Sequence, residues 1–222
     1  MIEVASKRRI IAPTRLSVSG FYCFGDQGMI PYESTLERDL LRKLAMSPRV
    51  LQIEAQPLTL CWDDDTGRAR RYTPDYLVHW RSMGEFYRDR EPSWLVEVKP
   101  RAVIRRSWLD LHPKFRVAAR FAAEKGWRFR VLDESRIRDT MFDNAVFLER
   151  YRRLNHRYSP EDLPPALLSG GVMCVGLVAD HLFGTPAACQ SYVWHLLGRR
   201  YLDCDLTQPL NLSTEVWLVE DP

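Results

Sequence analysis

The stretch WLVEVKP, residues 94–100, decides the fold of the larger part of the chain. Its hydrophobic residues alternate as in a β-strand, and Pro100 ends the strand because proline cannot donate to a central ladder. Residues two apart in a strand share one face, so Glu97 and Lys99 are predicted to point the same way. The opposite face, which we expect to be the packed one, carries Trp94, Val96 and Val98.

A second strand is predicted at residues 70–80, which contain Asp75 directly after a proline. The proline fixes the local backbone at the start of the strand, so pairing of the two strands can bring the carboxylate of Asp75 beside Glu97. Residues 50–62 are predicted to form the other arm of a hairpin, closed by the turn residues 63–67. Two carboxylates and a lysine would then converge.

A helix is predicted upstream at residues 34–46. Ser34 and Glu37 form the Ser-x-x-Glu pattern of a helix start, and leucines follow at helical spacing. At about 100° per residue, Glu37 falls within the arc of the leucines. The other charged residues of the helix fall outside that arc: Arg38, Asp39, Arg42 and Lys43. Glu37 is therefore the one charged residue predicted to point into the fold, with completion of a capping box by Ser34 as the alternative interpretation.

Further along the chain, residues 108–125 predict a helix that stops at Gly126, and residues 127–132 alternate as a strand. Strand, helix and strand imply a right-handed crossover between parallel strands. The core face of this last strand is predicted to carry Trp127, Phe129 and Val131. Another helix is predicted at residues 142–154, whereas residues 1–31 show no period and are expected to run as an arm over the surface. The predicted class is α/β, with a mixed central sheet flanked by helices.

Charge divides the chain, although the formal net charge is only +3. Residues 1–158 contain 30 Lys and Arg against 21 Asp and Glu, whereas residues 159–222 contain 2 against 8. We therefore predict two domains, with the boundary after Tyr158. Most of the basic charge is arginine, which favours nucleic-acid binding by the first part; a solvated arginine-rich surface is the alternative.

The second part has the pattern of a small winged-helix-like domain. Its predicted elements are three helices and two short strands, at residues 163–168, 172–183, 187–197, 201–205 and 214–219. Its negative charge opposes binding to a duplex, because affinity for DNA depends largely on neutralising phosphates. The apolar and aromatic residues there exceed what so small a module hides comfortably, so we expect it to dock a protein partner; they include Leu177, Phe183, Tyr192, Trp194, Leu196 and Leu197.

Composition excludes several classes of protein. With 45% hydrophobic and 27% charged residues, the chain is expected to fold. No apolar run approaches the roughly 20 residues that a membrane helix requires. The five cysteines form no C-x-x-C pair, so neither a zinc ribbon nor a disulfide framework is supported. We expect a cytoplasmic protein.

The residues Asp75, Glu97 and Lys99 suit phosphodiester hydrolysis. Mg²⁺ prefers hard oxygen ligands, typically one or two carboxylates with water and substrate phosphate, and Mn²⁺ accepts the same ligands. A lysine ammonium can orient the attacking water and offset the charge that develops on phosphorus. Each motif alone has a simpler interpretation, because a Pro-Asp pair is usually a turn and Glu-x-Lys is usually a solvated cross-strand ion pair.

Together these motifs resemble the PD-(D/E)xK nuclease superfamily, with its restriction-endonuclease-like fold. More narrowly, residues 34–78 followed by residues 96–100 resemble the TnsA endonucleases of heteromeric transposases. The resemblance implies a Mg²⁺-dependent site in which Glu37, Asp75 and Lys99 are catalytic and Glu97 is a second metal ligand beside Asp75, with Glu37 as a further candidate. Three arginines just past the lysine are candidates for phosphate contacts, with a solvated loop as the alternative: Arg101, Arg105 and Arg106.

The resemblance also implies partners. It implies that double-stranded DNA is cut at the 5′ ends of a transposon, beside a DDE-type transposase subunit that cuts the 3′ ends, in the nucleoid of a bacterial cell. An AAA+ regulator is implied as well, and the acidic C-terminal part is its predicted docking site. The alternatives are a restriction or repair nuclease of the same fold acting alone, and a catalytically silent DNA-binding adaptor.

Overall fold

The computed structural model describes residues 3–5, 18–81 and 91–219 of the 222-residue chain. Contacts divide the chain into two compact units, Met1–Ile137 and Arg138–Pro222. This division falls before the boundary predicted after Tyr158, because helix α5 (Thr140–Glu149) packs against helix α8 (Pro186–Arg199) of the second unit. None of the described helices is long and apolar enough to cross a membrane.

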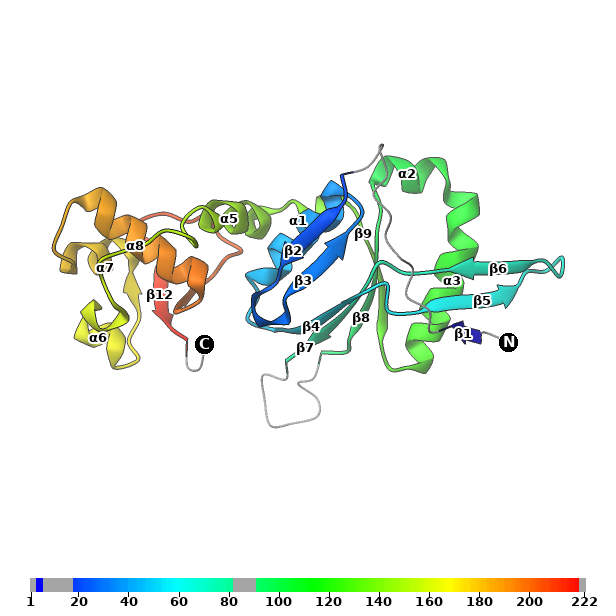
Figure 1. The fold of residues 1–222 in the computed structure, drawn as a ribbon, viewed down its shortest axis with the longest axis horizontal. Helices are drawn as coiled ribbons and strands as arrows, with labels where there is room; N and C mark the ends of the chain where they lie inside the picture. Colours follow the sequence, from blue (N-terminus) through cyan, green and yellow to red (C-terminus); the bar gives the residue numbers. More distant parts are fainter. Residues whose placement is uncertain (1–2, 6–17, 82–90, 220–222) are drawn as a thin grey trace. The chain divides into compact units, whose positions relative to one another are not determined.

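The first unit is built on a four-stranded sheet in the order β4-β7-β8-β9. These strands are β4 Val50–Ala55, β7 Tyr76–Trp80, β8 Trp94–Val98 and β9 Arg128–Leu132. Strands β4, β7 and β8 pair antiparallel, and β9 pairs parallel to β8 (Figure 1). The predicted mixed sheet, with a helix between its two parallel strands, is thereby confirmed.

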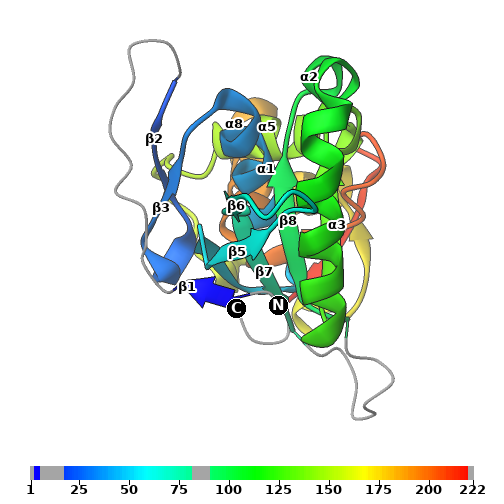
Figure 2. The ribbon, with the colours of Figure 1, turned by 90° about the vertical axis from the view of Figure 1, so that its right-hand side faces the viewer.

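Both faces of this sheet are covered (Figure 2). One face packs against helix α1 and a hairpin, and the other packs against helix α3. The covering elements are β2 Gly20–Cys23, β3 Met29–Tyr32, α1 Thr35–Ala45 and α3 Trp108–Glu124. Strand β8 is consequently buried on both sides, with Leu95 0% and Glu97 3% exposed, so the prediction of a single packed face was incomplete.

A second, three-stranded sheet has the order β1-β5-β6 and contains the predicted hairpin. Its strands are β1 Glu3–Ala5, β5 Thr59–Asp63 and β6 Ala69–Tyr72. The turn between β5 and β6 closes through a hydrogen bond from the Gly67 amide to the Asp64 carbonyl at 2.8 Å. The two arms were predicted as one continuous hairpin, but they divide into two pairs. Strands β5 and β6 pair next to the turn, and strands β4 and β7 pair further from it.

The prediction of a surface arm at residues 1–31 was wrong for its described C-terminal part. Strands β2 and β3 pair antiparallel, and their Tyr22 and Ile30 are 8% and 5% exposed within the core under α1. Residues 1–2 and 6–17 of the predicted arm lie outside the described residues. The helix predicted at residues 108–125 is confirmed as α3, and two short helices that were not predicted flank this region, α2 Arg101–Arg106 and α4 Glu134–Ile137.

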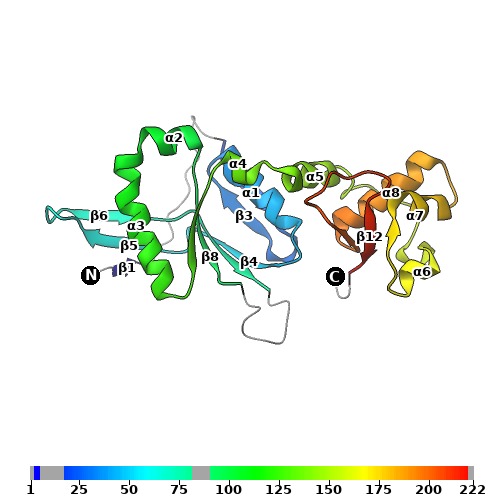
Figure 3. The same cartoon turned by 180° about the vertical axis from the view of Figure 1, so that it is seen from behind.

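The second unit gathers around helix α8, which contacts α5, α7 and β11 (Figure 3). Its remaining elements include α6 Pro165–Leu168, β10 Met173–Cys174, α7 Val175–His181, β11 Leu202–Cys204 and β12 Glu215–Leu218. The three strands form a sheet in the order β10-β12-β11. Strand β10 takes the start of the segment predicted as a helix at residues 172–183, and the winged-helix assignment stays a prediction.

Candidate active site

Asp75 lies at the start of β7, at the end where β8 leaves the sheet. The register pairs Tyr76 with Val96, so the next residues outward, Asp75 and Glu97, become cross-strand neighbours. The Asp75 amide donates to the Val96 carbonyl at 3.0 Å, and Asp75 Oδ2 accepts from the Val98 amide at 2.7 Å. The backbone of β8 thus fixes the Asp75 carboxylate beside Glu97, as the strand pattern predicted.

Glu97 is held on both of its carboxylate oxygens. Glu97 Oε1 lies 2.9 Å from Lys99 Nζ, and Glu97 Oε2 accepts from the Tyr72 hydroxyl at 2.7 Å. The side chain of Glu97 is 4% exposed and that of Lys99 is 31% exposed, because α3 covers this face of the sheet. The pair therefore differs from a solvated cross-strand ion pair, since one of its charges has been removed from water.

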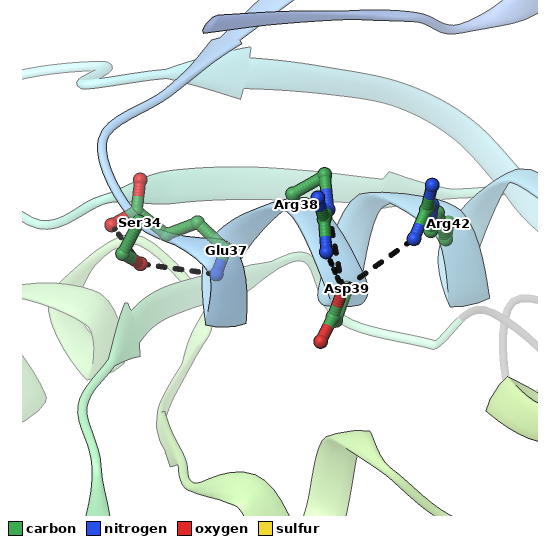
Figure 4. Close-up of polar contacts among 5 residues, drawn as sticks. All are labelled: Ser34, Glu37, Arg38, Asp39 and Arg42. Atoms are coloured by element: carbon green, nitrogen blue, oxygen red, sulfur yellow. Dashed lines mark hydrogen bonds and ion pairs between the residues drawn. The ribbon is translucent and has the colours of Figure 1, made fainter. Parts of the chain in front are cut away.

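Glu37 reaches the same end of the sheet from α1, where Ser34 is the N-cap. Ser34 Oγ accepts from the Glu37 amide at 3.2 Å and donates to Glu37 Oε1 at 2.8 Å (Figure 4). Glu37 Oε2 accepts from the Glu33 amide at 2.8 Å and from the Tyr76 hydroxyl at 3.3 Å. Glu37 therefore points inward as predicted, and its charge adds to the effect of burial and Glu97 in raising the pKa of Asp75. Among the described residues its carboxylate receives no bond from the Ser34 amide, so the capping box with Ser34 is not completed.

Asp39 on α1 is buried, although the sequence analysis placed it outside the buried arc of the helix. It is 3% exposed, and its Oδ1 lies 3.2 Å from Arg38 Nη2 and 3.9 Å from Arg42 Nη1 (Figure 4). The prediction that only Glu37 points inward was wrong because α4 packs along this side of α1, where Lys43 Nζ donates to the Arg136 carbonyl at 2.8 Å. A helical arc drawn from the leucines alone missed this second contact surface.

The three acids repel one another. Burial, then the charges of Glu97 and Glu37, raises the pKa of Asp75 well above its ordinary value. Burial likewise raises the pKa of Glu37. Burial lowers the pKa of Lys99, but Glu97 and Asp75 more than offset this effect and hold that pKa above its ordinary value. A single ammonium thus faces an excess of negative charge, which favours binding of a cation.

The donor set suits a hard divalent cation. Asp75 and Glu97 offer neighbouring carboxylates, and Mg²⁺ commonly takes one or two carboxylates from the protein. Within residues 3–5, 18–81 and 91–219 no three or more acid, histidine or cysteine side chains are placed so as to hold a metal together. Asp75 and Glu97 as ligands of the ion, and Glu37 as a third ligand, stay predictions.

The predicted phosphate-contacting arginines lie on a helix, where a loop was the alternative. Arg101, Arg105 and Arg106 are exposed on α2, which begins directly after Pro100. The Arg101 amide donates to Glu134 Oε2 at 2.9 Å, which ties the start of α2 to the start of α4. Their contact with DNA stays a prediction.

Tyr72 and Tyr76 are site residues that the sequence analysis missed. Burial and neighbouring acids raise the pKa of both phenols, so each remains a hydrogen-bond donor, Tyr72 to Glu97 and Tyr76 to Glu37. The signal in the sequence was weak. One tyrosine stands three residues before Asp75 and the other directly follows it, but only the bend between β6 and β7 brings both hydroxyls to the acids.

A mixed sheet between helices, with two acids and a lysine at the ends of its central strands, defines a class compatible with restriction-endonuclease-like nucleases. Residues 47–134 match the family model of the TnsA-like endonuclease N-terminal domain, which confirms the narrower resemblance for this part of the chain. The match includes Asp75, Glu97 and Lys99 but begins after Glu37. No curated protein matches the chain.

Proposed function

We propose that the chain is a Mg²⁺-dependent DNA endonuclease subunit of a heteromeric transposase, which hydrolyses phosphodiester bonds at the 5′ ends of the transposon during cut-and-paste transposition. One observation carries the proposal. Asp75, Glu97 and Lys99 converge at one end of the sheet, inside the segment that matches a TnsA-like endonuclease. That family supports DNA as substrate and a transposase as partner.

Each residue has a defined part in the proposed reaction. Asp75 and Glu97, with Glu37 as a further ligand, would hold Mg²⁺, or Mn²⁺ in its place. The ion would polarise the phosphodiester and lower the pKa of a bound water. The Lys99 ammonium keeps its proton beside Glu97, so it can donate to the attacking water or to a phosphate oxygen and offset charge there.

Two alternatives predict different behaviour. A stand-alone restriction or repair nuclease would cut without a transposase partner. A silent DNA-binding adaptor would have no use for the acids. The raised pKa values of Asp75 and Glu37 indicate that their charged carboxylates are unfavourable at these positions. A buried cluster of this kind favours a nuclease over an adaptor.

The proposed docking partner of the C-terminal unit is an AAA+ regulator. Support comes from the excess of acidic residues after residue 158 and from exposed apolar side chains on and after α7, with Leu177 57% and Phe183 90% exposed. The other four residues of this prediction are buried and give it no support: Tyr192, Trp194, Leu196 and Leu197. A DDE-type transposase subunit would cut the 3′ ends in the same complex.

The experiment is a reconstituted excision reaction with a DDE-type transposase subunit and DNA carrying transposon ends. Lys99→Ala should abolish 5′ cleavage and leave 3′ cleavage intact, because the lysine acts on the charge that develops during hydrolysis. Lys114→Ala, on α3, is the matched control and should cut both strands as wild type does. Undiminished 5′ cleavage by Lys99→Ala would remove the lysine from the mechanism, and 5′ cleavage without the transposase would favour the stand-alone nuclease.

A further inference from the structure

The second unit contains a basic pocket that the proposed nuclease chemistry does not use. Its volume is about 600 Å³, and it lies between the segment 152–160 and the second half of α8. Its lining includes Arg152, Arg153, His156, Tyr192, His195 and Arg199. The lining contains no aspartate or glutamate.

The three arginines supply uncompensated positive charge. Arg153 and Arg199 are exposed and Arg152 is partly buried, so guanidinium groups stand at the rim of the pocket. In the described part of the chain none of the three forms an ion pair with a carboxylate. Arginine stays protonated at any physiological pH, so the pocket attracts an anion from solution.

Two buried polar atoms of residues that line the pocket have no hydrogen-bond partner among the described residues. These atoms are the Tyr192 hydroxyl and His156 Nε2, and Tyr192 as a whole is only 2% exposed. The rings of His156 and His195 have centroids 4.8 Å apart, and His195 Nδ1 donates to the Tyr151 carbonyl at 2.9 Å. Buried polar groups are normally paired, so these two atoms point to a ligand at this place.

We propose that this pocket binds a phosphate group, with guanidinium groups of Arg152, Arg153 and Arg199 at its rim and the polar atoms of Tyr192 and His156 beneath it. Guanidinium forks match phosphate oxygens in geometry, and several of them match the charge of a phosphate better than that of a single carboxylate. The phosphate belongs either to a nucleic-acid backbone or to a small phosphorylated molecule.

Two acids near the pocket bind Ser159 and keep their negative charge. Asp162 Oδ2 accepts from the Ser159 amide at 2.6 Å, and Glu161 Oε2 accepts from the Ser159 hydroxyl at 2.6 Å. Burial, then the charges of Asp162 and Glu161, raises the pKa of Tyr192 to about 12, so its hydroxyl remains a donor. Both acids line a neighbouring pocket, on the side of Phe183.

The pocket also changes the expectation that the acidic C-terminal part of the chain does not bind phosphate groups. The count of 2 basic against 8 acidic residues started at Ser159, whereas the compact second unit starts at Arg138. The segment between these positions carries five arginines, of which Arg152 and Arg153 line the pocket. A unit with negative net charge thereby acquires a local site for an anion.

The first experiment titrates inorganic phosphate into the full chain and follows the side-chain NMR signals of its five histidines. Signals of His156 and His195 should shift saturably, whereas chloride at equal ionic strength should leave them in place. The double variant Arg152→Gln with Arg199→Gln should weaken binding by about tenfold or more. Arg150→Gln is the control for loss of charge, because it removes one arginine charge outside the pocket.

Tyr192→Phe keeps the test decisive if the arginine variant unfolds. Removing a hydroxyl without a partner should leave the melting temperature unchanged or higher, while phosphate affinity falls by about fivefold. Unmoved signals of His156 and His195 in folded wild-type protein would overturn the proposal. Equal phosphate affinity in Tyr192→Phe and wild type would also overturn it.

A second arm, with a short DNA duplex, separates the two sources of phosphate. If the source is nucleic acid, DNA shifts the same two histidine signals, and the double arginine variant lowers the salt slope of binding by about 2. If the source is a small molecule, inorganic phosphate binds while the salt slope for DNA stays the same. Both outcomes support a phosphate pocket, and neither depends on the nuclease site.

Discussion

Two inward-facing aspartates of the first unit, Asp39 on α1 and Asp75 before β7, have opposite surroundings. Asp39 lies between the guanidinium groups of Arg38 and Arg42, so the chain itself supplies its countercharge. Asp75 lies beside Glu97 and Glu37, and burial, followed by the charges of these two acids, raises its pKa well above the ordinary value. Burial is common to both regions, and only the second is left short of positive charge. A deficit of countercharge, rather than a buried acid as such, therefore marks the candidate site.

Replacing Asp75 should give the largest effect. Asp75→Asn should reduce 5′ cleavage by about a thousandfold or more, because a neutral amide cannot replace a carboxylate ligand. The same change should raise the free energy of unfolding in metal-free buffer by about 1 kcal/mol, since the amide oxygen keeps the bond from the Val98 amide while the repulsion disappears. Cleavage assays and urea denaturation measure the two effects.

Calorimetry supplies the control for this variant. Wild-type protein should take up Mg²⁺ or Mn²⁺ weakly, and Asp75→Asn should take up less, because two carboxylates without substrate leave most of the shell to water. Equal uptake by both proteins would contradict the assignment of Asp75 as a ligand. A lower free energy of unfolding for Asp75→Asn than for wild type would contradict the inference that Asp75 lacks a countercharge.

The matching change at Asp39 should act in the opposite direction. Asp39→Asn should lower the free energy of unfolding by about 2 kcal/mol, because Arg38 and Arg42 would lose the charge that lies between them. Cleavage per folded molecule should stay at the wild-type rate. A variant that is stable but inactive would show that Asp39 belongs to the site, and the contrast between the two aspartates would fail.

The strand pattern predicted the surroundings of Asp75. It did not predict the burial of Asp39, which depends on packing between distant segments. The period of two in WLVEVKP placed Glu97 and Lys99 on one face, and antiparallel pairing brought Asp75 beside them. Local rules of this kind need only neighbouring residues. The burial of Asp39 depends on α4, about a hundred residues further along the chain, and a helical arc read from one segment contains no such information.

The same limit explains the other differences. Strand β8 has two buried faces because α3 returns over it, although its alternation suggested a single packed face. The hairpin β2–β3 has no hydrophobic period and is held by contacts with α1. Helix α2 is short and begins at a proline, where a loop was an equally good interpretation.

Stability in metal-free buffer should depend on pH through Asp75. Because the pKa of Asp75 is raised on folding, the folded chain holds a proton there that the unfolded chain releases, and stability falls as pH rises above the ordinary pKa. Between about pH 5 and pH 8, wild type should lose about 1 kcal/mol more than Asp75→Asn. Identical slopes for wild type and Asp75→Asn would contradict the raised pKa.

The smallest effect should come from Tyr72, which touches the site only through Glu97. Tyr72→Phe removes the donor to Glu97 Oε2 and should slow cleavage by less than about tenfold at saturating Mg²⁺, while the Mg²⁺ concentration needed for half-maximal rate rises. The reason is that the tyrosine holds one oxygen of a ligand in place without contacting substrate. Tyr76→Phe, which removes the donor to Glu37, is the matched variant. A raised Mg²⁺ requirement in Tyr72→Phe alone would assign the ion to Asp75 and Glu97, and an equal rise in both variants would add Glu37. An unchanged requirement in Tyr72→Phe would show that the hydroxyl does not position Glu97.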